Sequence, residues 1–384
     1  MRSILIVAGE NSGEKYGANL IRQFKHLQSS FTFFGIGGKN MAEQDVTLLY
    51  SVEDLAVVGF FEIISHLPRI KAIFRRIKKE TIQHRPVAAV LIDSPDFNLR
   101  LAKHLKRASI PVLYYISPTV WAWRKRRLKS IKKAVDKMLL IFPFEEKIYA
   151  ECGIPAAYVG HPLKERTKVT IPKEEFFHKY RLDPENKLIA ILPGSRKSEI
   201  KFHMAVLAEA MKKIEKEWKT QFLLPLAENL SQDFVTSFLS KPSPDVRILS
   251  QDGYEAMAYS DITLSSCGTA NLEAALLGTP QVAFYRISPL SYYAGIRLMK
   301  IKNFSIVNIL AGKKIIPELI QRDFTVENIL GETRKILGSE RVRSAIKFEY
   351  EKIRQTLGEK TASENAAREL EEIVKNQEIL KEAT

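Results

Sequence analysis

The chain has 384 residues, of which 45% are hydrophobic, so it is long enough for two domains with their own cores and is neither disordered nor fibrous. Lys and Arg outnumber Asp and Glu by 59 to 44, and the net charge of +15 favours phosphates, nucleic acid or anionic lipid as partners without choosing among them. The two cysteines lack metal-ligand spacing, which argues against a zinc site or a disulfide framework and favours a reducing cytoplasm.

The first half of the chain alternates short β-branched runs with longer amphipathic runs. Strands are expected near 3–9, 31–37, 87–93, 111–116 and 137–142, with helices near 13–27 and 97–108. This alternation is typical of a parallel sheet covered by helices on both faces. A polar, proline-punctuated stretch after residue 160 indicates a connection between domains.

The second half repeats the alternation and then becomes helical. Strands are expected near 188–194, 221–227, 246–250, 261–266 and 281–286. We therefore predict an α/β fold of two Rossmann-like, doubly wound domains, residues 1–165 and 166–340, with helices in 341–384 packed on them. Ligands of open α/β sheets bind at the carboxyl ends of strands, so the active site is expected in a central cleft that the two domains face.

The loop after the first strand is glycine-rich and acidic. Its carboxylates disfavour a phosphate, so a neutral sugar hydroxyl is the better ligand, although an ordinary glycine turn has the same appearance. The candidate residues are Gly9, Glu10, Ser12 and Gly13.

Residues 60–79 have apolar positions at steps of three and four with basic residues between them. This pattern is typical of a helix lying on an anionic bilayer, and equally of a helix packed on a core with its charges in water. No segment of the chain approaches the roughly 18 apolar residues of a membrane-spanning helix, so any membrane contact should be peripheral. The candidate contacts are Ile63, Leu67, Ile70, Phe74, Arg75 and Arg76.

Two aspartates, Asp93 and Asp96, follow a buried strand at its carboxyl end. A carboxylate in this position can take the proton from an attacking hydroxyl during an inverting glycosyl transfer. The alternative is structural, with Asp96 capping the next helix and Asp93 hydrogen-bonded locally.

A basic and aromatic segment spans 115–133, and its candidate ligand contacts are Ser117, Trp121, Trp123 and Arg124. Aromatic and cationic side chains together suit nucleic acid, a sugar ring or a phosphate, and an exposed basic helix is the alternative. Further along, His161 lies at the expected domain junction and could reach the cleft, or simply belong to a turn fixed by Pro162.

Two loops of the second domain are suited to an anion. Residues 192–199 and 265–280 each follow a predicted strand and open a helix, where small residues and free amides can approach a phosphate. Arginine adds a bidentate contact in the first loop, and a carboxylate one turn into the second helix can bind ribose hydroxyls. The candidates are Gly194, Ser195, Arg196, Glu199, Cys267, Gly268, Thr269, Asn271 and Glu273. Asn308, Glu318 and Gln321 lie further along, where polar side chains could contact a sugar ring.

Taken in order, the segments GENSGE, SPTVWAWRKRR, GHPL, LPGSRKSE, CGTANLEAALLGTP and IPELIQ resemble those of the lipid A disaccharide synthase family, over nearly the whole chain. The resemblance implies the GT-B architecture and a hexosyltransferase acting in lipid A, and hence lipopolysaccharide, biosynthesis. The implied reaction condenses UDP-2,3-diacylglucosamine with 2,3-diacylglucosamine 1-phosphate into a β-1,6-linked disaccharide 1-phosphate and UDP, with inversion and without a cofactor or metal. It also implies peripheral attachment to the cytoplasmic face of the bacterial inner membrane. The resemblance leaves the oligomeric state undecided, with a homodimer as one alternative. No nucleic-acid partner is expected.

Carried over to this sequence, the resemblance makes Asp96 the leading base and Asp93 the second choice, with Arg196 on the diphosphate and Glu273 on the ribose. Three positions depart from the family pattern: aspartate is usual at the position of Glu14, glutamine at that of Thr119 and serine at that of Cys267. The alternatives are another UDP-N-acetylglucosamine enzyme of the same fold, either an epimerase or a cell-wall lipid glycosyltransferase, and a basic nucleic-acid-binding protein.

Overall fold

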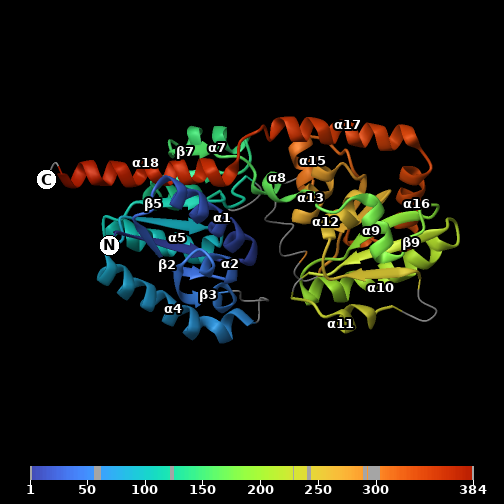
Figure 1. Ribbon diagram of the computed structural model, residues 1–384, viewed down its shortest axis with the longest axis horizontal. Coiled ribbons are helices and arrows are strands. Elements are labelled where there is room, and N and C mark those ends of the chain that lie inside the picture. Colours follow the sequence, from blue (N-terminus) through green and yellow to red (C-terminus); the bar gives the residue numbers. More distant parts are fainter. Residues whose placement is uncertain are drawn as a thin grey trace. The chain divides into compact units, whose positions relative to one another are not determined.

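The computed structural model describes residues 2–55, 62–121, 125–227, 229–239, 244–288, 292 and 303–382. They form two compact units (Figure 1). The first comprises Met1–Pro162 together with Leu357–Thr384, and the second comprises Leu163–Thr356. The C-terminal helices are therefore divided, because α17 (Glu340–Thr356) belongs to the second unit and α18 (Ala362–Glu382) to the first.

The first unit is built on a seven-stranded parallel sheet of order β3-β2-β1-β4-β5-β6-β7. Its strands are β1 (Arg2–Ala8), β2 (Phe31–Gly37), β3 (Val46–Ser51), β4 (Ala88–Ile92), β5 (Val112–Tyr115), β6 (Lys137–Leu140) and β7 (Ala156–Tyr158). The strand order reverses between β1 and β4, so the loops after these two strands leave in opposite directions. That reversal creates a crevice in which ligands of such folds bind.

Helices cover both faces of this sheet because successive strand residues point to opposite sides. Ile4 and Ile6 belong to the core with α1 (Asn11–Leu27) and α18, whereas Leu5 and Val7 belong to the core with α4 (Glu62–His84) and α5 (Pro95–Arg107). The remaining helices of the unit are α2 (Lys39–Ala42), α3 (Val52–Leu55), α6 (Arg127–Ala134) and α7 (Glu145–Glu151). Helix α8 (Pro162–Arg166) begins at Pro162, where the first segment of this unit ends, and continues into the second unit.

The second unit has a six-stranded parallel sheet of order β10-β9-β8-β11-β12-β13. Its strands are β8 (Lys187–Leu192), β9 (Thr220–Pro225), β10 (Val246–Leu249), β11 (Ile262–Ser266), β12 (Gln281–Tyr285) and β13 (Glu318–Ile320). Its further helices are α9 (Lys173–Tyr180), α10 (Lys197–Glu215), α11 (Gln232–Thr236), α12 (Gly253–Ala258), α13 (Thr269–Leu277), α15 (Ile306–Ala311), the 3₁₀ helix η1 (Gln321–Asp323) and α16 (Val326–Leu337). Here the order reverses between β8 and β11.

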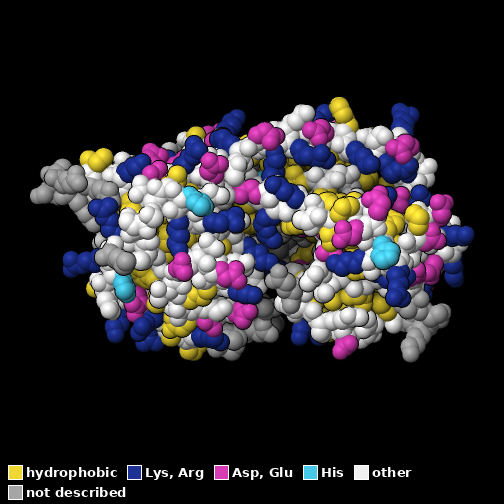
Figure 2. Space-filling view, in the orientation of Figure 1, with side chains coloured by type: hydrophobic (Ala, Val, Ile, Leu, Met, Phe, Trp, Pro, Cys, Tyr) yellow, Lys and Arg dark blue, Asp and Glu magenta, His cyan; other side chains and the backbone are white. Residues whose placement is uncertain are grey.

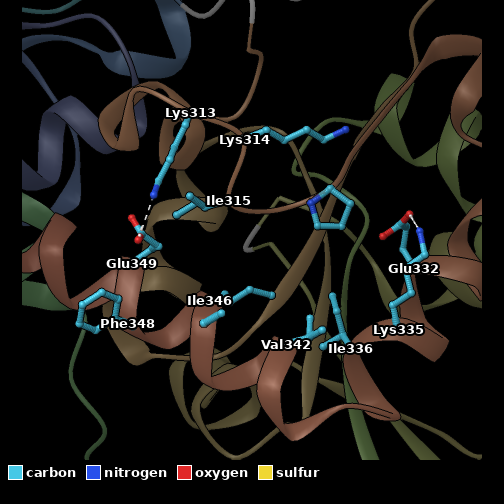
Figure 3. Close-up of a pocket in the computed structure, with 12 residues that line it drawn as sticks. Lys313, Lys314, Ile315, Glu332, Lys335, Ile336, Val342, Ile346, Phe348 and Glu349 are labelled. Carbon is cyan, nitrogen blue, oxygen red and sulfur yellow. Dashed lines mark hydrogen bonds and ion pairs between the residues drawn. The ribbon is translucent and has the colours of Figure 1, made fainter.

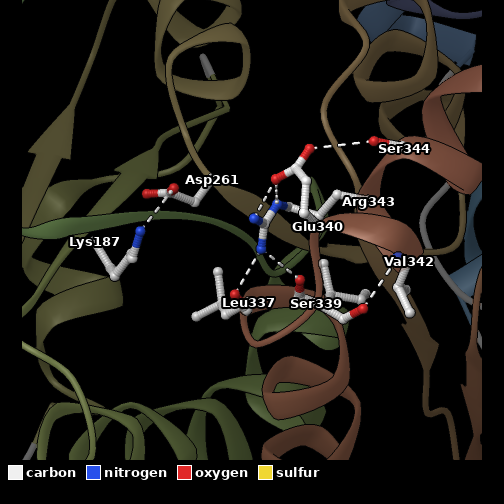
Figure 4. A network of polar contacts seen from close by, with 9 residues as sticks. Lys187, Asp261, Leu337, Ser339, Glu340, Val342, Arg343 and Ser344 are labelled. Carbon is white, nitrogen blue, oxygen red and sulfur yellow. Dashed lines mark hydrogen bonds and ion pairs between the residues drawn. The ribbon is translucent and has the colours of Figure 1, made fainter.

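A polar network connects the end of α16 with the start of α17 (Figure 4). The Arg343 guanidinium donates to the carbonyl oxygens of Ile336, at 2.9 Å, and Leu337, at 2.6 Å, and it also pairs with Glu340. The last carbonyls of a helix have no partner within it, so Arg343 satisfies groups that the end of α16 leaves open. Nearby, Lys187 pairs with Asp261 at 3.5 Å.

Surface charge is mixed on the face displayed in Figure 2, where Lys and Arg are spread over both units with Asp and Glu among them. Over the described residues, each helix is too short or too polar to cross a membrane.

Candidate active site

The loops after β1 and β4, at the reversal point of the first sheet, approach each other closely. The amide of Gly9 donates to the Ile92 carbonyl at 3.3 Å, and a Cβ atom at residue 9 would lie only 1.9 Å from the Ser94 Cβ. Gly9 is therefore required for close approach of the two loops. Glu10 and Ser12 are exposed at the same edge, where they can meet a ligand.

Asp93 lies in this crevice with a strained backbone. Its φ is +51°, and that of Ser94 is +44°, a region that non-glycine residues rarely occupy. The conformation is held by two donors to the Asp93 carbonyl, Asn98 Nδ2 at 2.8 Å and the Tyr114 hydroxyl at 2.6 Å. Burial, reinforced by the Glu10 carboxylate, raises the pKa of Asp93 to about 6, against the opposing effects of the Ser94 amide and Arg127.

Asp96 has a different environment in the first turn of α5. Its carboxylate accepts from Arg127 Nη2 at 2.7 Å, and its side chain is 75% exposed whereas that of Arg127 is 13% exposed. The two candidate bases are thus distinct: Asp93 is partly buried with a raised pKa, and Asp96 is a solvated partner of a partly buried arginine.

The segment after β5 forms a buried polar cluster with the segment after β6. Ser117 Oγ lies 2.8 Å from the Tyr149 hydroxyl, and both side chains are buried. Glu145, which the sequence analysis missed, is 1% exposed, and burial raises its pKa to about 7 although Ser117 and Trp121 favour its charged form. Among the described residues, neither Glu145 Oε2 nor Trp121 Nε1 makes a hydrogen bond of ordinary geometry. Glu145 opens α7, the helix that follows the buried strand β6, and this position is the signal that could have identified it.

Three other predictions for the first unit meet different outcomes. Trp123 and Arg124 lie outside the described residues. His161 was expected to reach a ligand, but it is 3% exposed beneath the Phe142 ring, and burial lowers its pKa to about 3. A direct contact between His161 and a ligand is therefore not supported.

Glu14, where the family pattern has aspartate, has a structural role in the first unit. It is buried and accepts from the Met41 amide and from Asn40 Nδ2, both at 2.8 Å. Gly13 is also buried, and a Cβ atom there would lie 3.2 Å from Ile92 Cγ2.

The apolar stripe of α4 faces the protein core over its described part. Ile73 and Ile77 are fully buried, and Ile70 and Phe74 are partly buried against the same core. Membrane contact by Ile70 and Phe74 is thus limited to their exposed parts and stays a prediction. Arg75 and Arg76 are exposed, and the side chains of Ile63 and Leu67 lie outside the described residues.

The loop between β8 and α10 lies at the reversal point of the second sheet. Gly194 has a φ of +123°, and Ser195 and Arg196 are exposed. The Glu199 carboxylate accepts from the amides of Ser195, at 3.0 Å, and Arg196, at 3.3 Å, and lies 3.6 Å from the Arg196 guanidinium. Glu199 thus accepts from the backbone amides that were expected to bind an anion. Because its carboxylate is negatively charged, it competes with such an anion for these amides.

The loop between β11 and α13 lies beside it at the same reversal point. Gly268 and Thr269 are exposed at the start of α13, and Glu273 accepts from the Tyr254 hydroxyl at 3.2 Å. The amide of Cys267 is engaged by the Phe284 carbonyl at 2.8 Å, and burial raises the pKa of its thiol. This loop therefore offers Gly268, Thr269 and Glu273 to a ligand more readily than Cys267.

Asn271 is fully buried, which does not support the predicted direct contact with the nucleotide sugar. Its amide nitrogen donates to Ser265 Oγ at 2.9 Å and Gln281 Oε1 at 3.0 Å, and its oxygen accepts from the Gly268 amide at 3.3 Å. Asn271 consequently supports the loop from beneath.

Asn308 is likewise fully buried, and its burial does not support the predicted sugar contact. Its oxygen accepts from the amides of Ile315 and Ile316, and its nitrogen donates to Glu318 at 2.8 Å. Glu318 in turn accepts from the Ser305 amide at 2.8 Å. Both side chains therefore order the segment before β13, and Gln321, which follows that strand, is only partly buried.

A cavity of about 700 Å³ opens beside the carboxyl ends of β12 and β13. Gln321 is among its lining residues, together with Phe202, Arg286, Ile287 and Arg322. Gln321 and this cavity thus lie at the carboxyl ends of the strands, where a nucleotide-sugar ligand is expected.

A second cavity, of about 500 Å³, lies beside the start of β13, between α16 and α17 (Figure 3). Its apolar wall includes Ile315, Ile336 and Ile346. Two of its rim lysines are paired with carboxylates, Lys313 with Glu349 at 3.1 Å and Lys335 with Glu332 at 2.6 Å. No predicted site residue lines it.

Known proteins resemble this chain over nearly its whole length. The family model described as lipid-A-disaccharide synthetase matches residues 4–374. Proteins named lipid-A-disaccharide synthase from Syntrophus aciditrophicus and Solibacter usitatus are 41% and 37% identical to it, covering 95% and 98% of this chain and 96% and 99% of their own.

Solved structures share the fold at low identity. The UDP-GlcNAc 2-epimerase from Neisseria meningitidis bound to UDP-GlcNAc has a TM-score of 0.66 at 13% identity, covering 97% of this chain and 100% of that chain. A glycosyltransferase from Rickettsia africae has a TM-score of 0.56 at 16% identity, covering 98% of each chain.

Two doubly wound parallel sheets, each with polar loops at its reversal point, define a GT-B type protein, the fold class of these glycosyltransferases and epimerases. Within that class the sequence match is specific. The chain belongs to the lipid-A-disaccharide synthetase family.

Proposed function

We propose that this chain is an inverting glycosyltransferase that condenses UDP-2,3-diacylglucosamine with 2,3-diacylglucosamine 1-phosphate. The products are a β-1,6-linked disaccharide 1-phosphate and UDP. The observation that carries the proposal is the family match over residues 4–374. Similarity to an epimerase extends only to the fold, at 13% identity, and a nucleic-acid-binding role would leave the polar loops at both reversal points without a function.

The second unit receives the diphosphate of the donor in this proposal. The exposed starts of α10 and α13 have a helix dipole behind them, and Arg196 adds a cation that is 59% exposed. A diphosphate that displaces Glu199 would also meet the amides of Ser195 and Arg196. These groups can stabilise the charge that develops on departing UDP, so the proposal assigns no metal to this step. Glu273, beside Tyr254, is proposed to bind the ribose hydroxyls.

The first unit supplies the base, and we assign that role to Asp93. A general base is most effective when its pKa lies near the working pH, and burial together with Glu10 raises the pKa of Asp93 to about 6. Asp96, by contrast, is bound to Arg127. We therefore place Asp93 on the 6-hydroxyl of the acceptor and Asp96 in support of Arg127, whose positive charge suits the acceptor phosphate.

The test compares Asp93→Asn with Asp96→Asn, using both lipid substrates and mass spectrometry of the product. The wild-type protein should form the disaccharide 1-phosphate. Asp93→Asn should lower kcat by about 100-fold or more, which is the usual contribution of a general base, while Asp96→Asn should have a smaller effect. A product other than the disaccharide would refute the reaction, and near-normal turnover of Asp93→Asn would refute only the base.

We also propose peripheral attachment to an anionic membrane, at the cytoplasmic face of the inner membrane, through the face that contains Arg75. Arg75 is exposed, while Arg76 is paired with Glu80 at 2.8 Å, so Arg75 is the freer of the two for lipid headgroups. Each basic residue near an anionic surface contributes about 1 kcal/mol.

The double variant Arg75→Glu/Arg76→Glu should therefore bind anionic vesicles at least tenfold more weakly in sedimentation assays. The control Lys103→Glu/Arg107→Glu makes the same charge change on exposed residues of α5. Equal weakening by both pairs would indicate a general effect of charge and would contradict a defined contact surface.

A further inference from the structure

His203 is a fully buried histidine of α10 that lies between two loops of the second unit. Its Nδ1 is 2.6 Å from the Pro193 carbonyl oxygen, in the loop after β8. Its Nε2 is 3.0 Å from both the amide nitrogen and the carbonyl oxygen of Arg286, in the loop after β12. The ring is packed edge-on against Phe284 and Phe324, at centroid distances of 5.2 and 5.6 Å.

The neutral ring has one tautomer that satisfies both contacts. A carbonyl oxygen can only accept, so Nδ1 must have the proton and donate to Pro193, which leaves Nε2 to accept from the Arg286 amide. Burial lowers the pKa of His203 and favours this neutral form, whereas the carbonyl oxygens of Pro193 and Arg286 and the Glu199 carboxylate favour the charged ring. The ring is thus a bridge with a defined direction of hydrogen bonding.

Arg286 extends the bridge to a third loop. Its guanidinium donates through Nε and Nη2 to the Gln321 carbonyl, at 3.2 and 3.0 Å, and through Nη2 to the Phe324 carbonyl, both after β13. It also lies over the Phe324 ring at 5.1 Å. Loops from three strands are consequently linked through two side chains at the carboxyl edge of the sheet.

The start of the bridge adjoins the anion loop. Pro193 directly precedes Gly194, Ser195 and Arg196, so the hydrogen bond from His203 fixes the point at which that loop leaves β8. Loss of the bond would free the loop backbone, whose amides must be held in place to bind an anion without a cost in ordering.

We propose that His203 is a positioning residue for the nucleotide sugar, which aligns the loop after β8 with the loops after β12 and β13. It acts through these loops, since a residue with no exposed surface cannot touch the ligand. This inference rests on the proposed function only in the identity of the ligand, a nucleoside diphosphate sugar.

The experiment separates the two bonds. His203→Leu removes both, His203→Asn keeps an amide near the position of Nδ1 for Pro193, and His203→Gln places an acceptor near the position of Nε2 for Arg286. The control Leu207→Ala cuts a fully buried side chain one turn further along α10 and destabilises the same helix without touching either loop contact. UDP affinity is measured by calorimetry, KM for donor and acceptor by steady-state kinetics, and Tm by melting.

His203→Leu is expected to weaken UDP binding and to raise the donor KM by about tenfold, with the acceptor KM unchanged. His203→Asn and His203→Gln should each recover part of that loss, and Leu207→Ala should lower Tm without changing UDP affinity. Unchanged UDP affinity in His203→Leu, or an equal loss in Leu207→Ala, would overturn the inference. If His203→Leu does not fold, the UDP affinities of His203→Gln and His203→Asn are measured instead. Unchanged UDP affinity in both would then overturn the inference. A wild-type protein that binds UDP but forms no disaccharide would refute the proposed function and leave this inference standing.

Discussion

Glu145→Gln tests whether the buried cluster after β5 and β6 contains a carboxyl group that keeps its proton well above the usual pH range of a glutamate. Glu145 is 1% exposed, and burial raises its pKa from 4.5 to about 7. The folded protein therefore holds this proton at pH values where the unfolded chain has released it. The free energy of unfolding should consequently fall as pH rises from about 4.5 to about 7, and then change no further through this group.

The size of the effect follows from the two pKa values. Their difference corresponds to about 3 kcal/mol over the full range, of which roughly 2 to 3 kcal/mol falls between pH 5 and pH 8.5. Glutamine has nearly the same shape and does not titrate. The stability of Glu145→Gln relative to the wild type should thus improve by that amount from pH 5 to pH 8.5, because the other titrating groups are common to both proteins.

Urea unfolding at several pH values, followed by circular dichroism, measures this difference. The control Glu151→Gln changes an exposed carboxylate at the end of the same helix, α7, and measures what the loss of a carboxylate from this helix does by itself. Parallel pH profiles for Glu145→Gln and the wild type would refute the reasoning, since they would mean that the carboxyl group is solvated or charged when buried.

Three further predictions concern the candidate site. The kcat of the wild type should rise with pH through an apparent pKa near 6, because Asp93 must lose its proton to act as a base, and a pH-independent kcat between 5 and 8 would contradict this role. Glu199→Gln should tighten UDP binding about fivefold in calorimetry, because the charged competitor for the Ser195 and Arg196 amides is removed; weaker binding would mean that Glu199 orders the loop instead. Asn271→Ala should lower the free energy of unfolding by about 2 kcal/mol in urea, because buried partners lose their hydrogen bonds.

The strand and loop pattern was accessible from the sequence because it depends on local features. A run of β-branched residues followed by a glycine and a polar helix start predicts a strand that ends in a ligand loop, and the residue pairs Gly9 with Asp93 and Gly194 with Gly268 occupy the two reversal points. The two parallel sheets confirm the predicted fold class. The order of strands in each sheet, which makes these loops neighbours, depends on pairing between distant segments.

The burial of polar side chains such as Asn271 could not be predicted from the sequence, because it depends on contacts with distant segments. Asn271 lies in a loop-to-helix segment typical of ligand contacts, but its partner Gln281 also bonds to Tyr350, a residue of the distant helix α17. The apolar stripe of α4 illustrates the same difficulty, because its spacing is identical for a helix on a core and a helix on a membrane. Only tertiary packing shows that Ile73 and Ile77 are enclosed.

The charges at the two reversal points also argue for the division of labour between the units. Glu10, Asp93 and Asp96 are at the edge of the first sheet, whereas the edge of the second has helix amides and Arg196. A diphosphate beside Glu10 and Asp93 would meet like charges, with Arg127 as the opposing charge already paired to Asp96, and it would raise the pKa of Asp93 further. Beside Arg196 the same anion meets opposite charge and displaces one carboxylate, Glu199. These charges therefore support the proposed placement of the donor on the second unit and of the base on the first.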